Sequence, residues 1–159
     1  MAYLVRGLDS RLFQPLFGLS DAELTARGVV RQEVDAPVGY PCRISLADAP
    51  AGATVLLLNH VHQPADTPYR ASHAIFVQEG VTETAEVRDE IPPVLSRRPF
   101  ISLRAFDARG MMVDADLCPG ADLDAPVRRL LGLPGVAYLL LNHVPVSYTH
   151  LTLPTKRIV

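Results

Sequence analysis

The sequence predicts a single-domain α+β protein with a largely antiparallel sheet and two or three short helices. Its 159 residues match the usual size of one domain with one hydrophobic core. Segments with strand-like patterns outnumber helical ones, and most neighbouring strands are joined by turns too short for a helical crossover. The composition, 48% hydrophobic and 20% charged, is typical of a globular chain and excludes disorder of the whole chain.

The first third of the chain contains one strand signal and one clear helix signal. Alternation at residues 3–8 predicts a short strand. Ser20 and Glu23 have the spacing of a capping box, in which each side chain accepts a hydrogen bond from the other residue's backbone amide. We therefore expect a short helix over residues 21–27, ended by Gly28 in the left-handed conformation.

Two paired strands are expected in the middle of the chain, after an alternating strand at residues 30–34. The continuous apolar centre of residues 54–62 predicts a strand buried on both faces within a sheet. Residues 72–78 predict the next strand. The loop between these two strands contains Pro64 and Pro68, which make it stiffer than an ordinary surface loop.

Residues 100–106 and 111–117 predict a hairpin with a three-residue loop, in which Gly110 takes the left-handed position. The alternation of apolar residues favours the register that places Arg104 across from Asp114. We therefore expect a structural salt bridge between these two side chains.

The remaining elements are an edge strand, a helix and a buried strand. The polar stretch at residues 82–87 predicts the edge strand. Apolar residues at helical spacing predict a helix over residues 122–131, with Gly132 as its end. Residues 136–141 predict the buried strand.

The C-terminal segment differs in composition from the rest of the chain. We expect residues 1–144 to form the globular domain and residues 145–159 to be a non-native tail, because this segment resembles translated sequencing-adapter DNA. It contains Lys156, the only lysine of the chain. The tail is expected to pack poorly, to bury little apolar surface and to carry no functional group, His150 included. The alternative is a genuine terminal strand.

Charge and motifs exclude several classes of function. A net charge of -2 gives no field that would attract nucleic acid. No segment has the roughly 20 apolar residues that span a membrane, and the N-terminus lacks a signal-peptide pattern, which indicates a cytoplasmic protein. The chain contains no phosphate-binding loop, dinucleotide glycine fingerprint or zinc-protease helix, so no cofactor is expected.

Three segments carry a family resemblance: GYPCR at residues 39–43, TPYRASHAIFV at residues 67–77 and SLRAF at residues 102–106. They resemble the bacterial family called domain of unknown function 1203, over residues 4–138. The resemblance implies a bacterial protein without an established activity. Beyond Leu139 the chain departs from the pattern expected of the family.

Three histidines are candidates for a shared site. His60 and His62 lie two residues apart on a strand, so their rings project from one face, and His73 begins the partner strand. Because the connecting loop is short, we expect His60 and His73 to lie close together. A metal would need a further ligand such as Asp66, and the competing interpretation is a set of hydrogen-bonded surface histidines.

Arginines near this loop are candidates for binding an anion. Tyr69 and Arg70 precede His73 on the loop and together offer a phenol, a guanidinium and an imidazole, groups that bind carboxylate or phosphate. Arg43 is a further candidate. The competing interpretation is that Arg70 and Arg43 fix the proline-containing loops to backbone carbonyls or to an internal carboxylate such as Asp66.

Three hypotheses for function therefore remain open. The first is a non-catalytic module that binds a small anion or a protein partner through the loop with Tyr69, Arg70 and His73. The second is a small enzyme with His60 or His73 as general base and Arg70 or Arg104 orienting an acidic substrate. The third is a structural protein, as a homodimer through an exposed sheet edge.

Overall fold

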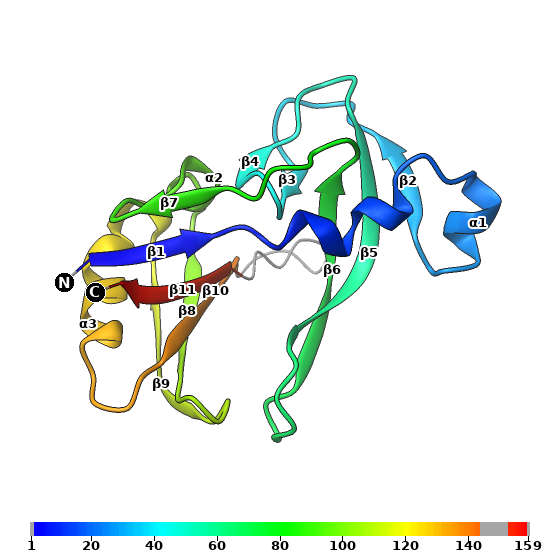
Figure 1. Ribbon diagram of the computed structural model, residues 1–159. Coiled ribbons are helices and arrows are strands. Elements are labelled where there is room, and N and C mark those ends of the chain that lie inside the picture. The colour runs from blue at the N-terminus through cyan, green and yellow to red at the C-terminus, as the bar shows by residue number, and fades with distance from the viewer. Residues whose placement is uncertain (1, 144–152, 159) are drawn as a thin grey trace.

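The computed structural model describes residues 2–143 and the backbone of residues 153–158 (Figure 1). These residues form two β-sheets. Sheet A has the strand order β7 (Glu86–Arg88), β1 (Ala2–Arg6), β11 (Leu153–Ile158), β10 (Tyr138–His143), β8 (Ile101–Phe106) and β9 (Met112–Cys118). Sheet B has the order β2 (Val30–Glu33), β5 (Thr54–Gln63), β6 (Ala71–Gln78), β3 (Pro41–Cys42) and β4 (Ala47–Asp48).

The pairing confirms the α+β class and the antiparallel character predicted from the short turns. The pair β3 and β6 is parallel, and the other described pairs are antiparallel. The strands divide into two sheets rather than the one that the sequence suggested. The helices in the described part of the chain are α1 (Asp21–Thr25), α2 (Pro93–Ser96) and α3 (Asp124–Leu131), with 3₁₀ turns at Ser10–Leu12, Gln14–Leu16 and Gly120–Asp122.

The N-terminus of α1 has the expected capping box. The backbone amide of Glu23 donates to Ser20 Oγ at 3.3 Å, and the amide of Ser20 donates to Glu23 Oε2 at 2.8 Å. These bonds satisfy two amides that have no partner inside the helix. Gly28 follows the helix with a φ of +70°, as the sequence predicted.

Strand β5 is less buried than its apolar sequence predicted. Val55 and Leu56 are fully buried, whereas Asn59 and Val61 are exposed. The reason is that β2 pairs with β5 only over residues 54–57, so the rest of β5 is paired on one side alone, with β6. The β5–β6 hairpin therefore extends beyond sheet B as an arm that runs alongside the β8–β9 hairpin of sheet A (Figure 1).

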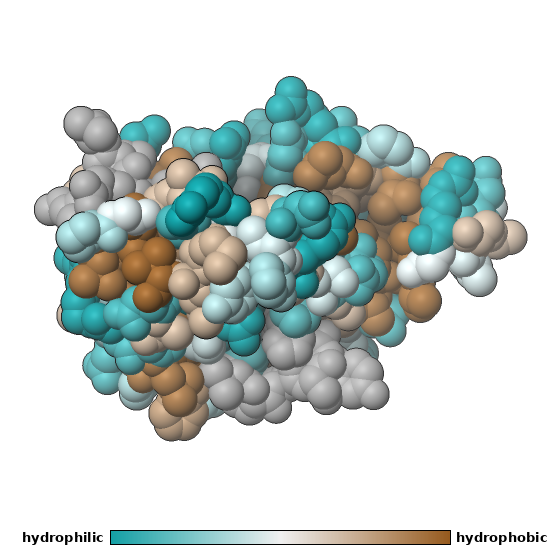
Figure 2. All heavy atoms as spheres, turned by 90° about the horizontal axis from the view of Figure 1, so that it is seen from below, coloured by the Kyte–Doolittle hydropathy of each residue, from teal (hydrophilic) through white to brown (hydrophobic). Residues whose placement is uncertain are grey.

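The core of sheet A lies between its inner face and α3. The apolar residues of the helix predicted from the 3.6-residue spacing are fully buried and pack on the inward residues of β8, β10 and β1. These inward residues are Tyr3, Val5, Ile101, Leu103, Ala105, Leu139 and Leu141. A second apolar cluster covers one face of sheet B, and brown, apolar residues gather at the end of the molecule that carries α1 and β2 (Figure 2).

The β8–β9 hairpin forms as predicted, and Gly110 has a φ of +82°, but the predicted register is wrong by one residue. Arg104 pairs with Ala115, and Asp114 pairs with Ala105, so Arg104 and Asp114 lie on opposite faces and form no salt bridge. The shift arises at a β-bulge, because Phe106 pairs with Met112 as in the predicted register, whereas Ala105 pairs with Asp114. In the shifted register the carboxylates of Asp114 and Asp116 contact Arg129 of α3 at 3.6 Å and 2.6 Å.

The C-terminal segment is described only in part. The backbone of β11 pairs with β1 on one side and with β10 on the other. Residues 144–152, which include His150, and the side chains of β11 lie outside the described residues. The expectations that this tail is non-native and buries little apolar surface therefore stay predictions.

Candidate functional site

The candidate site is a cleft where the loop of the β5–β6 arm meets the loop of the β8–β9 hairpin. Thr67 Oγ1 donates a hydrogen bond to the backbone carbonyl of Gly110 at 3.2 Å. A Cβ atom placed on Gly110 would lie only 2.3 Å from Cβ of Ala65. The two loops thus touch directly, although they are more than 40 residues apart in sequence.

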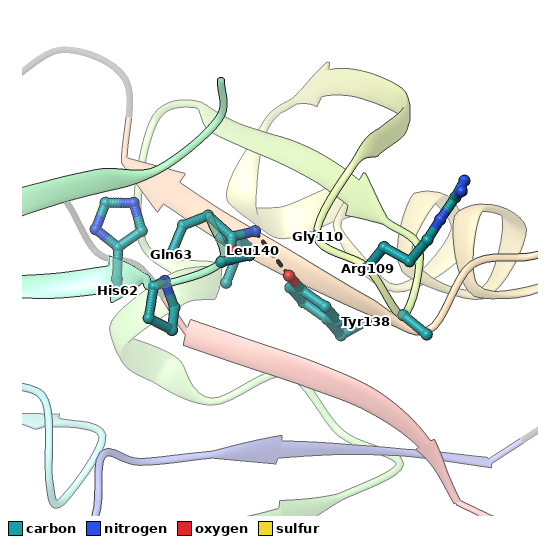
Figure 3. A pocket seen from close by; sticks show the side chains of 9 residues that line it. His62, Gln63, Arg109, Gly110, Tyr138 and Leu140 are labelled. Atoms are coloured by element: carbon teal, nitrogen blue, oxygen red, sulfur yellow. Dashed lines mark hydrogen bonds between the residues drawn. The ribbon is translucent and has the colours of Figure 1, made fainter. Parts of the chain in front are cut away.

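The cleft has a volume of about 430 Å³ and is bounded by both sheets. Its main lining residues are His62, Gln63, Pro64, Arg109, Gly110, Tyr138 and Leu140. The volume is within the range of sites that take small molecules. Figure 3 shows that Arg109 extends away from the other labelled side chains, and its guanidinium pairs with Asp107 at 3.0 Å.

One hydrogen bond joins the two sheets across the cleft. Nε2 of Gln63, which is 2% exposed, donates to the hydroxyl oxygen of Tyr138 at 2.7 Å (Figure 3). The Tyr138 ring stacks on Phe106 with 5.4 Å between centroids and 14° between planes. The phenol is thereby held in one position, and its own hydroxyl proton is a donor with no acceptor among the described residues.

The three histidines lie together, as their spacing predicted. His60 and His73 are direct cross-strand partners, and the His62 ring stacks on that of His73 with 4.4 Å between centroids. Of the three, His62 lines the cleft. His60 packs near the ring of Phe13, and burial lowers the pKa of His60.

Tyr69 and Arg70 hold the loop that carries them. Arg70 Nη1 donates to the carbonyl of Pro64 at 2.5 Å, which brings the guanidinium to a wall of the cleft. The Tyr69 amide donates to Thr67 Oγ1, and the Tyr69 ring meets the Phe106 ring edge-on at 6.1 Å. This is the loop-fixing role that the sequence left open for Arg70.

Arg43 lies away from the cleft, in the interior. It is 1% exposed, and Nη1 donates to the carbonyl of Pro41 at 2.6 Å. Burial lowers its pKa to about 9. The structure therefore does not bring Arg43 together with Arg70 at one surface site.

Arg104 is the sequence candidate with the most open environment. It is the cross-strand partner of Leu140, so it lies on the face of sheet A that carries the cleft residues Leu140 and Tyr138. It is exposed, and its guanidinium forms no hydrogen bond or ion pair with any residue that the structure describes. Arg104 is thus an uncompensated positive charge beside the cleft.

No set of three or more His, Cys, Asp or Glu side chains is placed to hold a metal ion within residues 2–143. Asp66, considered from the sequence as a fourth ligand, makes no hydrogen bond in this part of the chain. No helix in the described ranges is long and apolar enough to cross a membrane.

The family match covers both loops of the cleft. Over residues 39–147 the chain matches the family described as "Protein of unknown function (DUF1203)". The chain belongs to this family. No curated protein and no solved structure matches it. Because the DUF1203 match begins before β3 and ends after β10, it includes the cleft residues and Arg104.

Several residues of this DUF1203 cleft were not found from the sequence. Gln63, Gly110, Tyr138 and Leu140 come from three separate elements, and the hydrogen bond between Gln63 and Tyr138 spans 75 residues. No local pattern marks such a contact. The only usable signal was the proximity of Gln63 to the pair of histidines that precede it.

Proposed function

We propose that this DUF1203 protein is a non-catalytic binding module that takes a small anion in the cleft beside Arg104. The observation that carries the proposal is the position of Arg104, exposed, opposite Leu140 of the cleft and unpaired among the described residues. A guanidinium in such a position donates well to a carboxylate or phosphate. The bacterial cytoplasm, expected from the sequence, is the location that we assign to this module.

The other groups at the cleft support an anion rather than a cation. The Tyr138 hydroxyl offers a proton, since its oxygen already accepts from Gln63. The guanidinium of Arg70 lies at the Pro64 wall and keeps donors beyond the one that this carbonyl uses. The nearby carboxylate of Asp107 is occupied by the amides of Arg109 and Met111 and by the Arg109 side chain. The groups left for a ligand are therefore mainly donors.

Binding is favoured over catalysis by the surroundings of His60. This candidate base packs near Phe13 and does not line the cleft, and it makes no hydrogen bond to a carboxylate among the described residues. A general base must reach the proton that it removes from the substrate. His73 lies behind His62 rather than in the lining of the cleft.

Titration with inorganic phosphate and with malonate, followed by NMR of the backbone amides, tests the proposal and separates the two anion classes. We expect one of them to shift the resonances of Gly110 and His62. Arg104→Gln should weaken that binding about tenfold, the loss expected when one charge-assisted hydrogen bond is removed.

The matched control is Arg97→Gln. Arg97 is also exposed, forms no ion pair within the described ranges and lies outside the cleft. This variant should bind the anion as the wild type does. Absence of any shift at the cleft, or equal affinity of wild type and Arg104→Gln, would refute the proposal.

A further inference from the structure

The cleft is much larger than the anionic group that we place in it. Its volume is about 430 Å³. A carboxylate group fills the space of two water molecules, about 60 Å³. A ligand that fits this cleft therefore has a body several times larger than its charged group.

The walls that such a body would touch are mainly apolar. The buried side chain of Leu140 and the ring of Pro64 both line the cleft. Arg109 also lines it, but its guanidinium is paired with Asp107 and extends away from the other labelled side chains (Figure 3). Asp66, on the loop of the β5–β6 arm, is not a lining residue. The body of the ligand is therefore uncharged and apolar.

Two pairs of stacked rings flank the cleft, one from each sheet. In sheet B, His62 stacks on His73 with 4.4 Å between centroids and 12° between planes. In sheet A, Tyr138 stacks on Phe106 with 5.4 Å between centroids and 14° between planes. One ring of each pair, His62 or Tyr138, lines the cleft.

The two lining rings belong to the same small site. Gln63, the residue after His62, donates to the hydroxyl oxygen of Tyr138 at 2.7 Å. Figure 3 shows Gln63 and Leu140 between His62 and Tyr138. A flat ring that lies on Leu140 thus has an aromatic side chain on each side, and aromatic groups contact one another in offset or edge-on arrangements.

The two donors for a carboxylate lie next to each other on sheet A. Arg104 is the cross-strand partner of Leu140, and Tyr138 precedes Leu140 by two residues, so all three project from one face. Diagonal neighbours such as Arg104 and Tyr138 are about 7–8 Å apart, a distance that long side chains span. The Arg104 guanidinium and the Tyr138 hydroxyl proton have no acceptor among the described residues. Both can therefore donate to the oxygens of one carboxylate.

We infer that the ligand of the cleft is an aromatic carboxylate. Its carboxylate accepts from Arg104 and from the Tyr138 hydroxyl, and its ring lies on Leu140 beside His62. This inference rests on the anion site proposed for the cleft and names the class of its ligand. A small anion without a ring fills only the charged end, so malonate is expected to bind weakly.

Titration with benzoate, followed by NMR of the Gly110 and His62 amides, tests the inference against three analogues. Benzoate should bind at least about tenfold more tightly than acetate, which lacks the apolar body. It should bind about threefold more tightly than cyclohexanecarboxylate, whose ring is not aromatic. Benzamide, which keeps the ring but has no charge, should bind at least about tenfold more weakly than benzoate.

The outcomes separate the ligand class from the anion site itself. Benzoate binding no tighter than acetate or cyclohexanecarboxylate would overturn the inference and leave the anion site standing. Binding of malonate or phosphate without benzoate would do the same. Equal binding of benzoate and benzamide would overturn the inference, since the charge would not be recognised. Absence of a shift with every one of these anions would refute the anion site as well.

Two variants, each checked for an unchanged thermal midpoint, place the ligand. Arg104→Gln should weaken benzoate binding about tenfold and leave benzamide binding unchanged. Ala108 is exposed and lines the cleft, so Ala108→Trp should abolish benzoate binding by filling the space of the ligand ring. Ala51→Trp, in an exposed turn outside the cleft, is the matched control and should bind benzoate as the wild type does. Unchanged benzoate binding in Arg104→Gln or in Ala108→Trp would also overturn the inference.

Discussion

Gly110 and Ala65 approach so closely that only glycine fits at the first position. A Cβ atom on Gly110 would lie 2.3 Å from the Cβ of Ala65, and Gly110 has a φ of +82°. The contact joins the loop of the β8–β9 hairpin to that of the β5–β6 arm. The cleft between the two sheets depends on it.

Gly110→Ala should lower the free energy of unfolding by about 2–5 kcal/mol. The left-handed conformation costs an L-residue about 1–2 kcal/mol, and the steric conflict with Ala65 adds about 1–3 kcal/mol. Urea denaturation measures the change. Gly80→Ala is the matched control, because Gly80 has a φ of +86° and no atom within 4 Å of its Cβ position. It should lose only the conformational part, and equal losses would mean that the contact with Ala65 adds nothing.

Tyr138→Phe should lower the free energy of unfolding by about 1–2 kcal/mol. The change keeps the ring that stacks on Phe106 but leaves the buried Nε2 of Gln63 without its acceptor. Thermal unfolding of the variant measures the loss. Tyr69→Phe serves as the control, since the Tyr69 hydroxyl makes no hydrogen bond among the described residues. A similar midpoint for both variants would show that the bond to Gln63 does not contribute.

Local features of the fold were predicted from the sequence, and features set by distant residues were not. The capping box of Ser20 and Glu23 and the turn at Gly110 each lie within a few residues, so their patterns were sufficient. The alternation of apolar residues in the hairpin favoured a register without the β-bulge between Ala105 and Phe106, and it carries no signal of the contact between Asp116 and Arg129 of α3.

In the candidate site, too, the local contacts were predicted from the sequence and the contacts between distant residues were not. The pairing of His60 with His73 was predicted because a short loop joins their strands. The hydrogen bond between Gln63 and Tyr138 and the position of Arg104 opposite Leu140 depend on how the two sheets and their strands are arranged. The sequence offers no local pattern for that arrangement. It therefore identified Arg104 as a candidate residue but did not predict its position beside the cleft.

The exposed edge of sheet A at β9 is protected by its own aspartates. The amide of Ala115 donates to Asp114 Oδ1, and the amide of Leu117 donates to Asp116 Oδ1, both at 2.7 Å. Edge strands with free amides pair with other chains. We expect the double variant Asp114→Ala and Asp116→Ala to raise the association constant for dimerisation about tenfold, since two amides become available for pairing.

Sedimentation equilibrium measures this association. The control is the double variant Glu90→Ala and Asp122→Ala, which removes two negative charges from exposed side chains outside the edge strand. If the control associates as strongly as the variant at β9, the effect comes from net charge rather than from the freed amides.

The stability of the protein should fall as the pH drops below about 4, and Asp124 should account for part of the loss. Hydrogen bonds from Arg128 and from the hydroxyl of Tyr3, at 2.8 Å and 2.7 Å, lower the pKa of Asp124. An aspartate has a pKa of about 3.9 in an unfolded chain. The folded pKa is the lower one, so the stabilisation is fully present above the unfolded pKa and is lost as the pH falls through the folded pKa.

Thermal midpoints measured from pH 7 to pH 3 should therefore decline less steeply for Asp124→Asn than for the wild type. Asp66→Asn, whose carboxylate forms no ion pair in the described ranges, should follow the wild-type curve. Parallel curves for Asp124→Asn and the wild type would show that the bonds from Arg128 and Tyr3 do not stabilise the folded state.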